Sequence, residues 1–350
     1  DILTSLYNRH YVETFLNSRF LEGTPFLAIG INIFGFRGIN DIFGYHNGDL
    51  CLKELALRLS QFDGVAARLT GGELLWLPES LPTTEFIHSL KSALEAPIDT
   101  GVVVININVA IGLIYCPKDA TTSEEVFKRL NIVLDEAQIT RQFVLPFNSE
   151  LEERYSRRLS IITELKNTLE HAKEELSLNY QPKLDLKNGK VTQVEALIRW
   201  TNPRLGFVSP EDFIAVAEQA GFIENITSWV INRAIDEAAR FKEANIEVSV
   251  AINLSAKDIM SPALLPKVLA LLKAKDLKAE CLSFEITEGD LVRDHDKAII
   301  HLKAFRNEGF EIAIDDFGTG YSSMAYLQNL PVNTLKVDKS FVLKLHQQDG

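Results

Sequence analysis

Two adjacent carboxylates, Asp315 and Asp316, close an apolar run and precede a turn with glycines at Gly318 and Gly320. Side chains alternate faces along a strand, so a strand end normally presents one acid at a time. Two acids in succession can bind one metal ion at two points or two ions together, and the glycines let the backbone approach a ligand. A simpler alternative is a turn in which an Asp caps the next helix.

Strand-like and helix-like segments alternate from residue 176 onward. The strand-like segments are 177–185, 191–199, 247–253, 281–286, 310–315 and 333–337. Segments with helical apolar spacing lie between them at 210–218, 225–244, 263–275 and 294–308. Repeated β–α units predict a parallel sheet, and this many units predict an α/β TIM-like barrel. The catalytic side chains of such barrels lie at the carboxyl ends of the strands.

The predicted strand ends are rich in charges and oxygen ligands. In chain order they are Glu195, Asn253, Glu285, Asp315 with Asp316, and Lys336 with Asp338. Carboxylate and amide oxygens suit Mg²⁺ or Mn²⁺ rather than zinc. The sequence therefore predicts a carboxylate-rich metal centre at one end of the barrel.

The residues around these strand ends resemble the signature of EAL domains over about 176–345. The matching segments are 195–200 with Pro203, Gly206, Ser209 and Pro210, then 253–255, 285–288, 315–323 and 336–341. EAL domains are TIM-like barrels that hydrolyse cyclic di-GMP to linear pGpG with two divalent cations. The resemblance implies that fold, that reaction and two Mg²⁺ or Mn²⁺ ions per site. It also implies that the last barrel strands, and a further Glu of the second metal site, lie beyond Gly350.

The resemblance assigns roles residue by residue. The ligands of the first metal would be Glu195, Asn253, Glu285 and Asp315. Asp315 would bridge to a second metal held by Asp316 near Asp338, and Lys336 would orient or help deprotonate the attacking water. Glu195, Asp316 and Lys336 would thus form the catalytic set.

Substrate contacts follow from the same resemblance. They would be Gln181, Leu197 and Arg199, and Glu288 would anchor the loop at 317–323. The Arg199 guanidinium would offer a fork to a substrate phosphate. The alternative for Arg199 is a surface salt bridge.

The first half of the chain is predicted to be an α+β domain. Its strand-like segments are 26–34, 64–69, 72–77, 102–116 and 142–146, and its helical segments are 47–61, 83–95 and 123–138. Residues 1–9 and 36–49 resemble GGDEF domains, palm-like domains that make cyclic di-GMP from two GTP molecules. Asn40 and Asp49 match the guanine-recognition positions of that family.

The GGDEF resemblance is degenerate at the positions that carry chemistry. Asn32 and Phe34 stand where acids are expected, Gly72 stands at the Asp of the signature turn, and Gln138 and Gln142 replace two cations. Phosphoryl transfer depends on metal and cation clamps for the phosphate charge. We therefore expect no cyclase activity. The product-inhibition motif is also expected to be absent, since Gln61 and Gly64 occupy its places.

Residual GTP binding at Asn40 and Asp49 stays open. The alternatives are that Asn40 caps a turn and that Gly48 and Asp49 begin a helix. The expected domains are 1–147 for the degenerate GGDEF domain, 148–175 for a connecting helix and 176–350 for the EAL domain. The charged helix at 151–175 is either a transmission or homodimer element or a solvated linker.

Composition limits the classes of partner. The 350 residues carry a formal net charge of −12, which disfavours nucleic-acid binding. Cys51, Cys116 and Cys281 are scattered, as is typical of a reducing cytosol. The expected location is bacterial cytoplasm, with an upstream sensor or membrane segment left open.

The leading hypothesis is a cyclic di-GMP phosphodiesterase with an inactive GGDEF half. The alternatives are a receptor that binds cyclic di-GMP without cleaving it and a scaffold that docks a partner. A replaced carboxylate among the metal positions would favour the receptor, and the visible positions are all retained.

Overall fold

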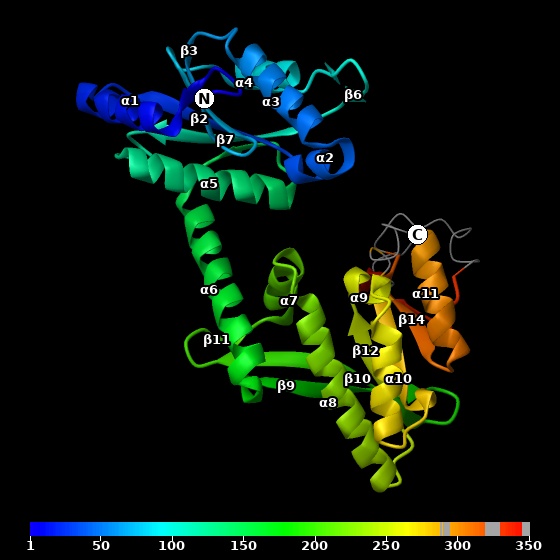
Figure 1. The fold of residues 1–350 in the computed structure, drawn as a ribbon. Helices are drawn as coiled ribbons and strands as arrows, with labels where there is room; N and C mark the ends of the chain where they lie inside the picture. The colour runs from blue at the N-terminus through cyan, green and yellow to red at the C-terminus, as the bar shows by residue number, and fades with distance from the viewer. Residues whose placement is uncertain (288, 290–294, 319–329, 345–350) are drawn as a thin grey trace, which may run out of the picture. The chain divides into compact units, whose positions relative to one another are not determined.

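The chain forms two compact units. A computed structural model describes residues 1–287, 289, 295–318 and 330–344 (Figure 1). The units are Asp1–Arg157 and Arg158–Gly350. Each unit has its own hydrophobic core.

The first unit is built on a six-stranded sheet with the order β1-β3-β4-β2-β7-β8. The strands are β1 (Tyr7–Asn8), β2 (Phe26–Ile33), β3 (Gly64–Thr70), β4 (Glu73–Pro78), β7 (Val109–Cys116) and β8 (Val144–Pro146). The central strand β2 pairs antiparallel with β4 and β7. It is buried along almost its whole length because helices cover both faces of the sheet.

Helices pack on the two faces of this sheet (Figure 1). They are α1 (Arg9–Glu22), α2 (Phe36–Phe43), α3 (Tyr45–Leu59), α4 (Thr84–Leu94) and α5 (Ser123–Thr140). Val12 of α1 and Leu130 of α5 share one core cluster with strand residues, whereas Leu55 of α3 and Leu90 of α4 share another. The result is a three-layer α/β/α arrangement.

Three expectations for this unit need correction. The predicted strand 102–116 divides into β6 (Val104–Ile105) and β7, because β6 leaves the main sheet to pair with β5 (Ile98–Asp99). Helix α3 begins at Tyr45, so Gly48 and Asp49 lie inside it and do not start it. Asn40 likewise lies within α2 and not in a capped turn. Sequence reasoning also left out α1 and α2.

A single helix, α6 (Ser149–His171), contains the boundary between the two units. Near its start, Glu152 forms ion pairs with Lys128 and Arg129 of α5. Further along, Leu165 is buried in the core of the second unit. The helix was predicted at 151–175; a short 3-10 turn at Lys173–Glu175 completes that segment.

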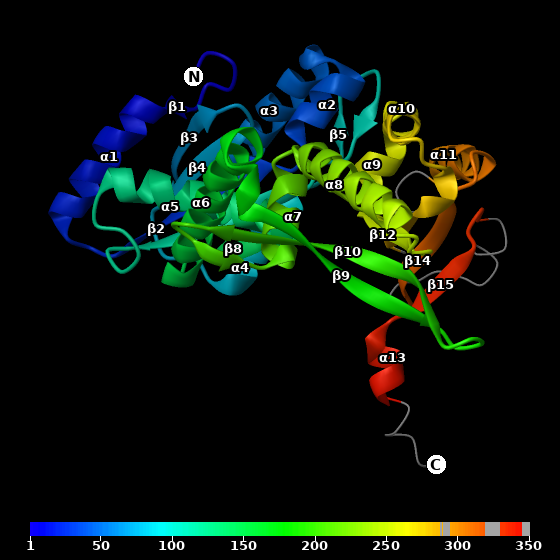
Figure 2. The same ribbon diagram turned by 90° about the horizontal axis from the view of Figure 1, so that it is seen from below.

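The second unit contains a seven-stranded sheet (Figure 2). Its strands are β9 (Leu176–Asp185), β10 (Lys190–Asn202), β11 (Gly206–Val208), β12 (Ser249–Leu254), β13 (Leu282–Thr287), β14 (Glu311–Phe317) and β15 (Thr334–Val337). Strands β10, β12, β13, β14 and β15 are parallel in that order. This arrangement is the half-barrel sheet of a TIM-like barrel.

Five described helices accompany the strands of this sheet. They are α7 (Pro210–Gln219), α8 (Ile223–Glu243), α9 (Ala256–Met260), α10 (Leu264–Ala274) and α11 (His295–Asn307), and α13 (Lys339–Lys344) follows β15. Every second strand residue, such as Val250, Ile252 and Leu254 in β12, belongs to the core that these helices share. The alternate residues occupy the opposite face, which carries the polar side chains.

One expectation about strand pairing in the second unit is wrong. Strands β9 and β10 form an antiparallel hairpin and are not parallel neighbours. The intervening turn is too short for the crossover that two parallel strands require. Strand β11 also pairs antiparallel with β10.

Among the described residues, none of the helices combines the length and the apolar character of a membrane span.

Candidate metal and active centre

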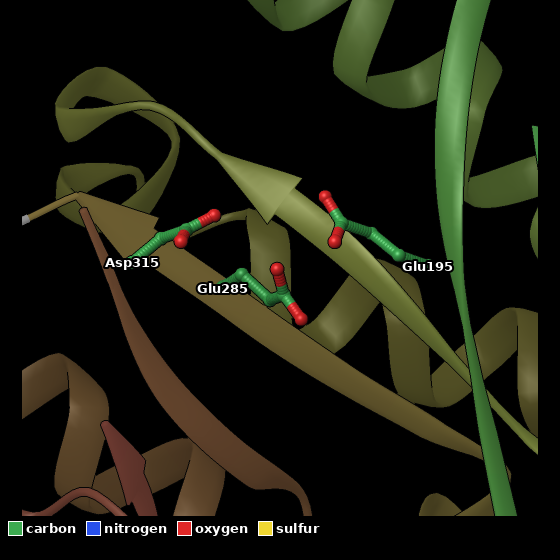
Figure 3. A group of neighbouring side chains, drawn as sticks. All are labelled: Glu195, Glu285 and Asp315. Atoms are coloured by element: carbon green, nitrogen blue, oxygen red, sulfur yellow. The ribbon is translucent and has the colours of Figure 1, made fainter. Parts of the chain in front are cut away.

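Three carboxylates from three strands meet on the polar face of the second sheet. They are Glu195 of β10, Glu285 of β13 and Asp315 of β14, with ligand atoms within 4.8 Å of one another. Figure 3 shows these side chains converging from their separate strands. The side chain of Glu285 is only 1% exposed. A positive charge among them stabilises like charges this close, one of which is buried.

Lys336 of β15 supplies one such charge. Its Nζ donates to Glu195 Oε2 at 3.0 Å, to Asp315 Oδ2 at 2.6 Å and to Glu285 Oε2. Burial alone would lower the pKa of Lys336, but the hydrogen bonds to Asp315 and Glu285 raise it above its ordinary value. Lys336 is therefore held as a charged group at the centre of the cluster.

Asn253 of β12 adjoins the same cluster. Its Nδ2 donates to Glu195 Oε1 at 3.0 Å, and its strand position lies beside that of Glu285. This hydrogen bond uses the nitrogen of the amide, which makes the oxygen the end that can bind a metal. Three carboxylates and an amide oxygen form a donor set that fits Mg²⁺ or Mn²⁺.

A backbone irregularity changes the orientation of Asp316, the second residue of the Asp315–Asp316 pair. The register between β14 and β15 shifts between Ile314 and Phe317, and Asp316 has a left-handed φ of 54°. Regular strand geometry would send Asp315 and Asp316 to opposite faces. Burial, followed by the charges of Asp315 and Asp338, raises the pKa of Asp316.

Asp338 follows β15 on the chain. Its backbone N–H donates to Phe317 O at 3.4 Å, and its Oδ1 accepts from Ser340 N at 2.8 Å. Hydrogen bonds from Ser340 hold the pKa of Asp338 below its ordinary value. The structure thus places Asp338 within electrostatic range of Asp316 and ties it to the backbone.

The expected position of Glu195 at a strand end needs correction. Strand β10 continues to Asn202, because β9 and β11 both pair with the segment after Glu195. Glu195 therefore lies in the middle of β10, and its side chain contributes to the cluster from there.

The three predicted substrate residues lie near the cluster. A cavity of about 640 Å³ is lined by Leu197 and Arg199 together with Glu195, Asn253 and Asp315. Gln181 is the antiparallel partner of Glu195 on β9. Arg199 donates to the carbonyl of Ile198 at 2.8 Å and, among the residues described, makes no salt bridge. Glu288 lies outside the described residues.

One cluster residue escaped sequence reasoning. Lys183 of β9 donates to Glu285 Oε1 and to Gln193 Oε1, the latter at 2.9 Å. A lysine in a strand with one buried residue carries no local signal of this contact.

The degenerate positions of the first unit have structural partners. Phe34 packs edge-to-face on Phe143 with ring centroids 6.0 Å apart. A Cβ at Gly72 would lie 3.2 to 3.3 Å from the Phe36 side chain. The Asn40 side chain packs tightly against Gly48, which precedes Asp49. The two candidate guanine residues therefore lie on successive helices.

Two protein families match the chain. The model of the diguanylate cyclase GGDEF domain matches residues 1–142, and the model of the EAL domain matches residues 162–350. A solved structure described as a MucR phosphodiesterase in complex with c-di-GMP shares 35% identity over 54% of this chain and 76% of that chain, with a TM-score of 0.51.

Curated relatives match the chain across both units. The bifunctional diguanylate cyclase/cyclic di-GMP phosphodiesterase MucR of Pseudomonas aeruginosa is 31% identical over all of this chain and 53% of its own length. The cyclic di-GMP phosphodiesterase PA2567 of the same species is 31% identical over 99% of this chain and 60% of its own length. The chain thus spans about half the length of the curated relatives it matches.

A Vibrio cholerae LapD structure with S-helix, GGDEF and EAL parts covers 98% of this chain at 19% identity with a TM-score of 0.54, which bears on the fold alone. Together with the two family matches, this establishes the order of the domains. The chain belongs to the EAL-domain family, with a GGDEF domain preceding the EAL domain.

Proposed function

We propose that the protein hydrolyses cyclic di-GMP to linear pGpG in its EAL unit. The observation that carries the proposal is the convergence of Glu195, Glu285 and Asp315 beside a cavity of about 640 Å³. That volume is in the range of sites for small-molecule ligands. Relatives named as cyclic di-GMP phosphodiesterases support the choice of substrate.

We assign the residues as follows. Glu195, Asn253, Glu285 and Asp315 would hold a first Mg²⁺ or Mn²⁺, and Asp315, Asp316 and Asp338 would contribute to a second. Bound divalent ions would lower the pKa of a water molecule and neutralise phosphate charge.

The chain's own polar groups then position the reactants. Lys336 would orient the attacking water, since its ammonium already lies among the three carboxylates. Arg199 would move from the carbonyl of Ile198 to a phosphate oxygen, and Leu197 would contact the apolar part of the nucleotide. Gln181 would contact substrate from β9, opposite Glu195.

The test uses the full-length protein with cyclic di-GMP and either Mg²⁺ or Mn²⁺, and pGpG is quantified chromatographically. We expect turnover with either ion and a loss of at least about a hundredfold in Glu195→Ala. Glu243→Ala, an exposed acid at the end of α8, is the matched control and should retain full activity. Tight binding of cyclic di-GMP without turnover would replace hydrolysis by the receptor alternative.

We further propose that the GGDEF unit makes no cyclic di-GMP. Asn32 and Phe34 lack the carboxylates that would bind metal, and Phe34 packs on Phe143. A side chain at Gly72 would require Phe36 to shift. Incubation with GTP and Mg²⁺ should yield no cyclic di-GMP, measured with Glu195→Ala so that hydrolysis does not consume the product.

Binding of GTP by Asn40 and Asp49, and formation of a homodimer, remain predictions. Calorimetry with GTP tests the first, and light scattering with and without cyclic di-GMP tests the second.

A further inference from the structure

Glu285 lies between two lysines that contact different oxygens of its carboxylate. Lys336 contacts Oε2, the oxygen on the side of Glu195 and Asp315. Lys183 contacts Oε1 from the opposite edge of the sheet. The Glu285 side chain is 1% exposed, whereas that of Lys183 is 30% exposed. A buried carboxylate thus has one oxygen in the cluster and the other in a separate contact.

A polar network fixes the position of Lys183. Its Nζ also donates to Gln193 Oε1 at 2.9 Å, and Gln193 is its register partner on β10. The amide nitrogen of Gln193 donates to Ser249 Oγ at 3.2 Å and to Ser283 Oγ at 2.9 Å. These serines lie on β12 and β13, so the network joins four strands. Both ends of the Gln193 amide are used, which determines that its oxygen faces Lys183.

The two lysines differ in what a divalent cation would do to them. A cation bound by Glu195, Glu285 and Asp315 would compete with the Lys336 ammonium for the oxygens that Lys336 now contacts. Lys183 contacts the remaining oxygen of Glu285, outside that competition. Hydrogen bonds to the far side of a ligand fix its orientation, and their loss typically weakens metal binding about 10- to 100-fold.

We propose that Lys183 is a positioning residue of the metal centre, which holds Glu285 Oε1 so that Oε2 alone is presented to the cation. The proposal rests on the metal centre assigned under the proposed function. It gives a role to a residue on the antiparallel strand β9, outside the strand ends that supply the ligands. Gln193 is then the support that holds Lys183 in place.

Charge repulsion and ligand orientation predict opposite changes in cation affinity when Lys183 is removed, so the direction of the change decides between them. Removal of a positive charge near a cation site should by itself tighten cation binding. Loss of orientation should weaken it. The proposal therefore predicts a direction that simple charge repulsion contradicts.

The experiment measures Mn²⁺ binding to the full-length protein directly, from the electron paramagnetic resonance signal of free Mn²⁺. In Lys183→Met and Lys183→Gln, the Kd for Mn²⁺ at the site of Glu195, Glu285 and Asp315 should rise at least about tenfold relative to wild type. Lys183→Arg keeps a charged donor and should restore most of the affinity. Lys190→Met removes an exposed lysine from the same hairpin and should leave the Kd unchanged.

Turnover provides a second readout. At saturating Mn²⁺, kcat of Lys183→Met should recover toward the wild-type value, because Lys183 contacts neither substrate nor water in this proposal. Circular dichroism in EDTA checks that each variant is folded. If Lys183→Met does not fold, the contrast between Lys183→Arg and Lys183→Gln decides the question.

Unchanged or tighter Mn²⁺ binding in Lys183→Gln, with wild type binding normally, overturns the role of Lys183 and leaves the proposed function intact. Absence of Mn²⁺ binding in wild type overturns both. The two failures are therefore distinguishable in one titration.

Discussion

Replacement of Lys336 by methionine should destabilise the metal-free EAL unit. Methionine keeps an unbranched chain of similar size and removes the ammonium. Lys336 contacts three carboxylates, and Lys183 contacts only one of them. In Lys336→Met, Glu195 and Asp315 would lose their shared cation and face each other and Glu285.

The size of the effect follows from burial. Removal of one partner of a buried ion pair costs about 3–5 kcal/mol, whereas exposed pairs contribute about 0–1 kcal/mol. The Lys336 side chain is 24% exposed, and the side chains of Glu195, Asp315 and Glu285 are 13%, 22% and 1% exposed. Glu285 keeps Lys183. We therefore expect a loss of about 2 to 3 kcal/mol in the free energy of unfolding.

The assay is urea unfolding in EDTA, followed by tryptophan fluorescence in a Trp76→Phe background. That background leaves Trp200 and Trp229, both in the second unit. The Trp76 N–H has no hydrogen-bond partner among the described residues, so the phenylalanine breaks no bond there. The midpoint should fall by about 1 M urea. Lys339→Met, an exposed neighbour, is the control and should leave the midpoint unchanged.

Manganese should reverse part of the loss. In wild type a bound cation would compete with the Lys336 ammonium, so Mn²⁺ should stabilise Lys336→Met more than wild type by mass action. An unfolding midpoint equal to that of wild type in EDTA would refute the electrostatic reasoning. Equal stabilisation by Mn²⁺ in both proteins would show that Lys336 and the cation do not share a site.

Three further outcomes are expected. Arg58→Met should cost about 2 to 3 kcal/mol in urea unfolding of the first unit, because its guanidinium bonds the carbonyls of Leu94, the last residue of α4, and of Ala96 and Pro97 beyond it; exposed Lys53→Met should have little effect. Glu175 accepts from Thr168, Trp200 and Asn202; burial alone would raise its pKa, but these bonds lower it below the ordinary 4.5. A carboxylate whose pKa is lower in the folded than in the unfolded protein contributes its full stabilisation above the unfolded-state pKa. The difference in free energy of unfolding between wild type and Glu175→Gln should therefore be full at neutral pH and shrink as the pH falls below 4.5. Glu174→Gln is the control. Gly318→Ala should lower the thermal midpoint of the second unit, because the residue has φ +100° and a Cβ would lie 2.7 Å from the Phe341 ring.

Local patterns in the sequence predicted most strands of both units. Val194, Ala196 and Ile198 occupy alternate positions of one strand, with Gln193, Glu195 and Arg199 on the other face, and the structure buries the three apolar residues together. The oxygen-bearing residues that close or interrupt such strands were recognisable for the same reason. Adjacent parallel strands bring them to one place, as the register of Asn253 beside Glu285 illustrates.

Features that depend on distant pairing could not be predicted. The contact between Lys183 and Glu285 spans 102 positions of the chain, and nothing local to Lys183 indicates it. The extension of β10 past Glu195 depends on pairing with β9 and β11. Helix α1, by contrast, was overlooked although its signals are local: an N-cap at Asn8, a left-handed Gly23 at its end, and apolar residues at helical spacing, Val12, Phe15, Leu16 and Phe20, that pack in one core cluster.

The left-handed backbone of Asp316 has a consequence for mutagenesis. Aspartate, asparagine and glycine adopt this conformation readily, whereas other residues pay roughly 1–2 kcal/mol for it. Asp316→Ala would therefore change the path of the chain between Asp315 and Phe317 as well as remove a carboxylate. Asp316→Asn removes the charge and retains the conformation. An alanine scan would overstate the chemical importance of this position, and the asparagine variant separates the shape of the loop from the charge it carries.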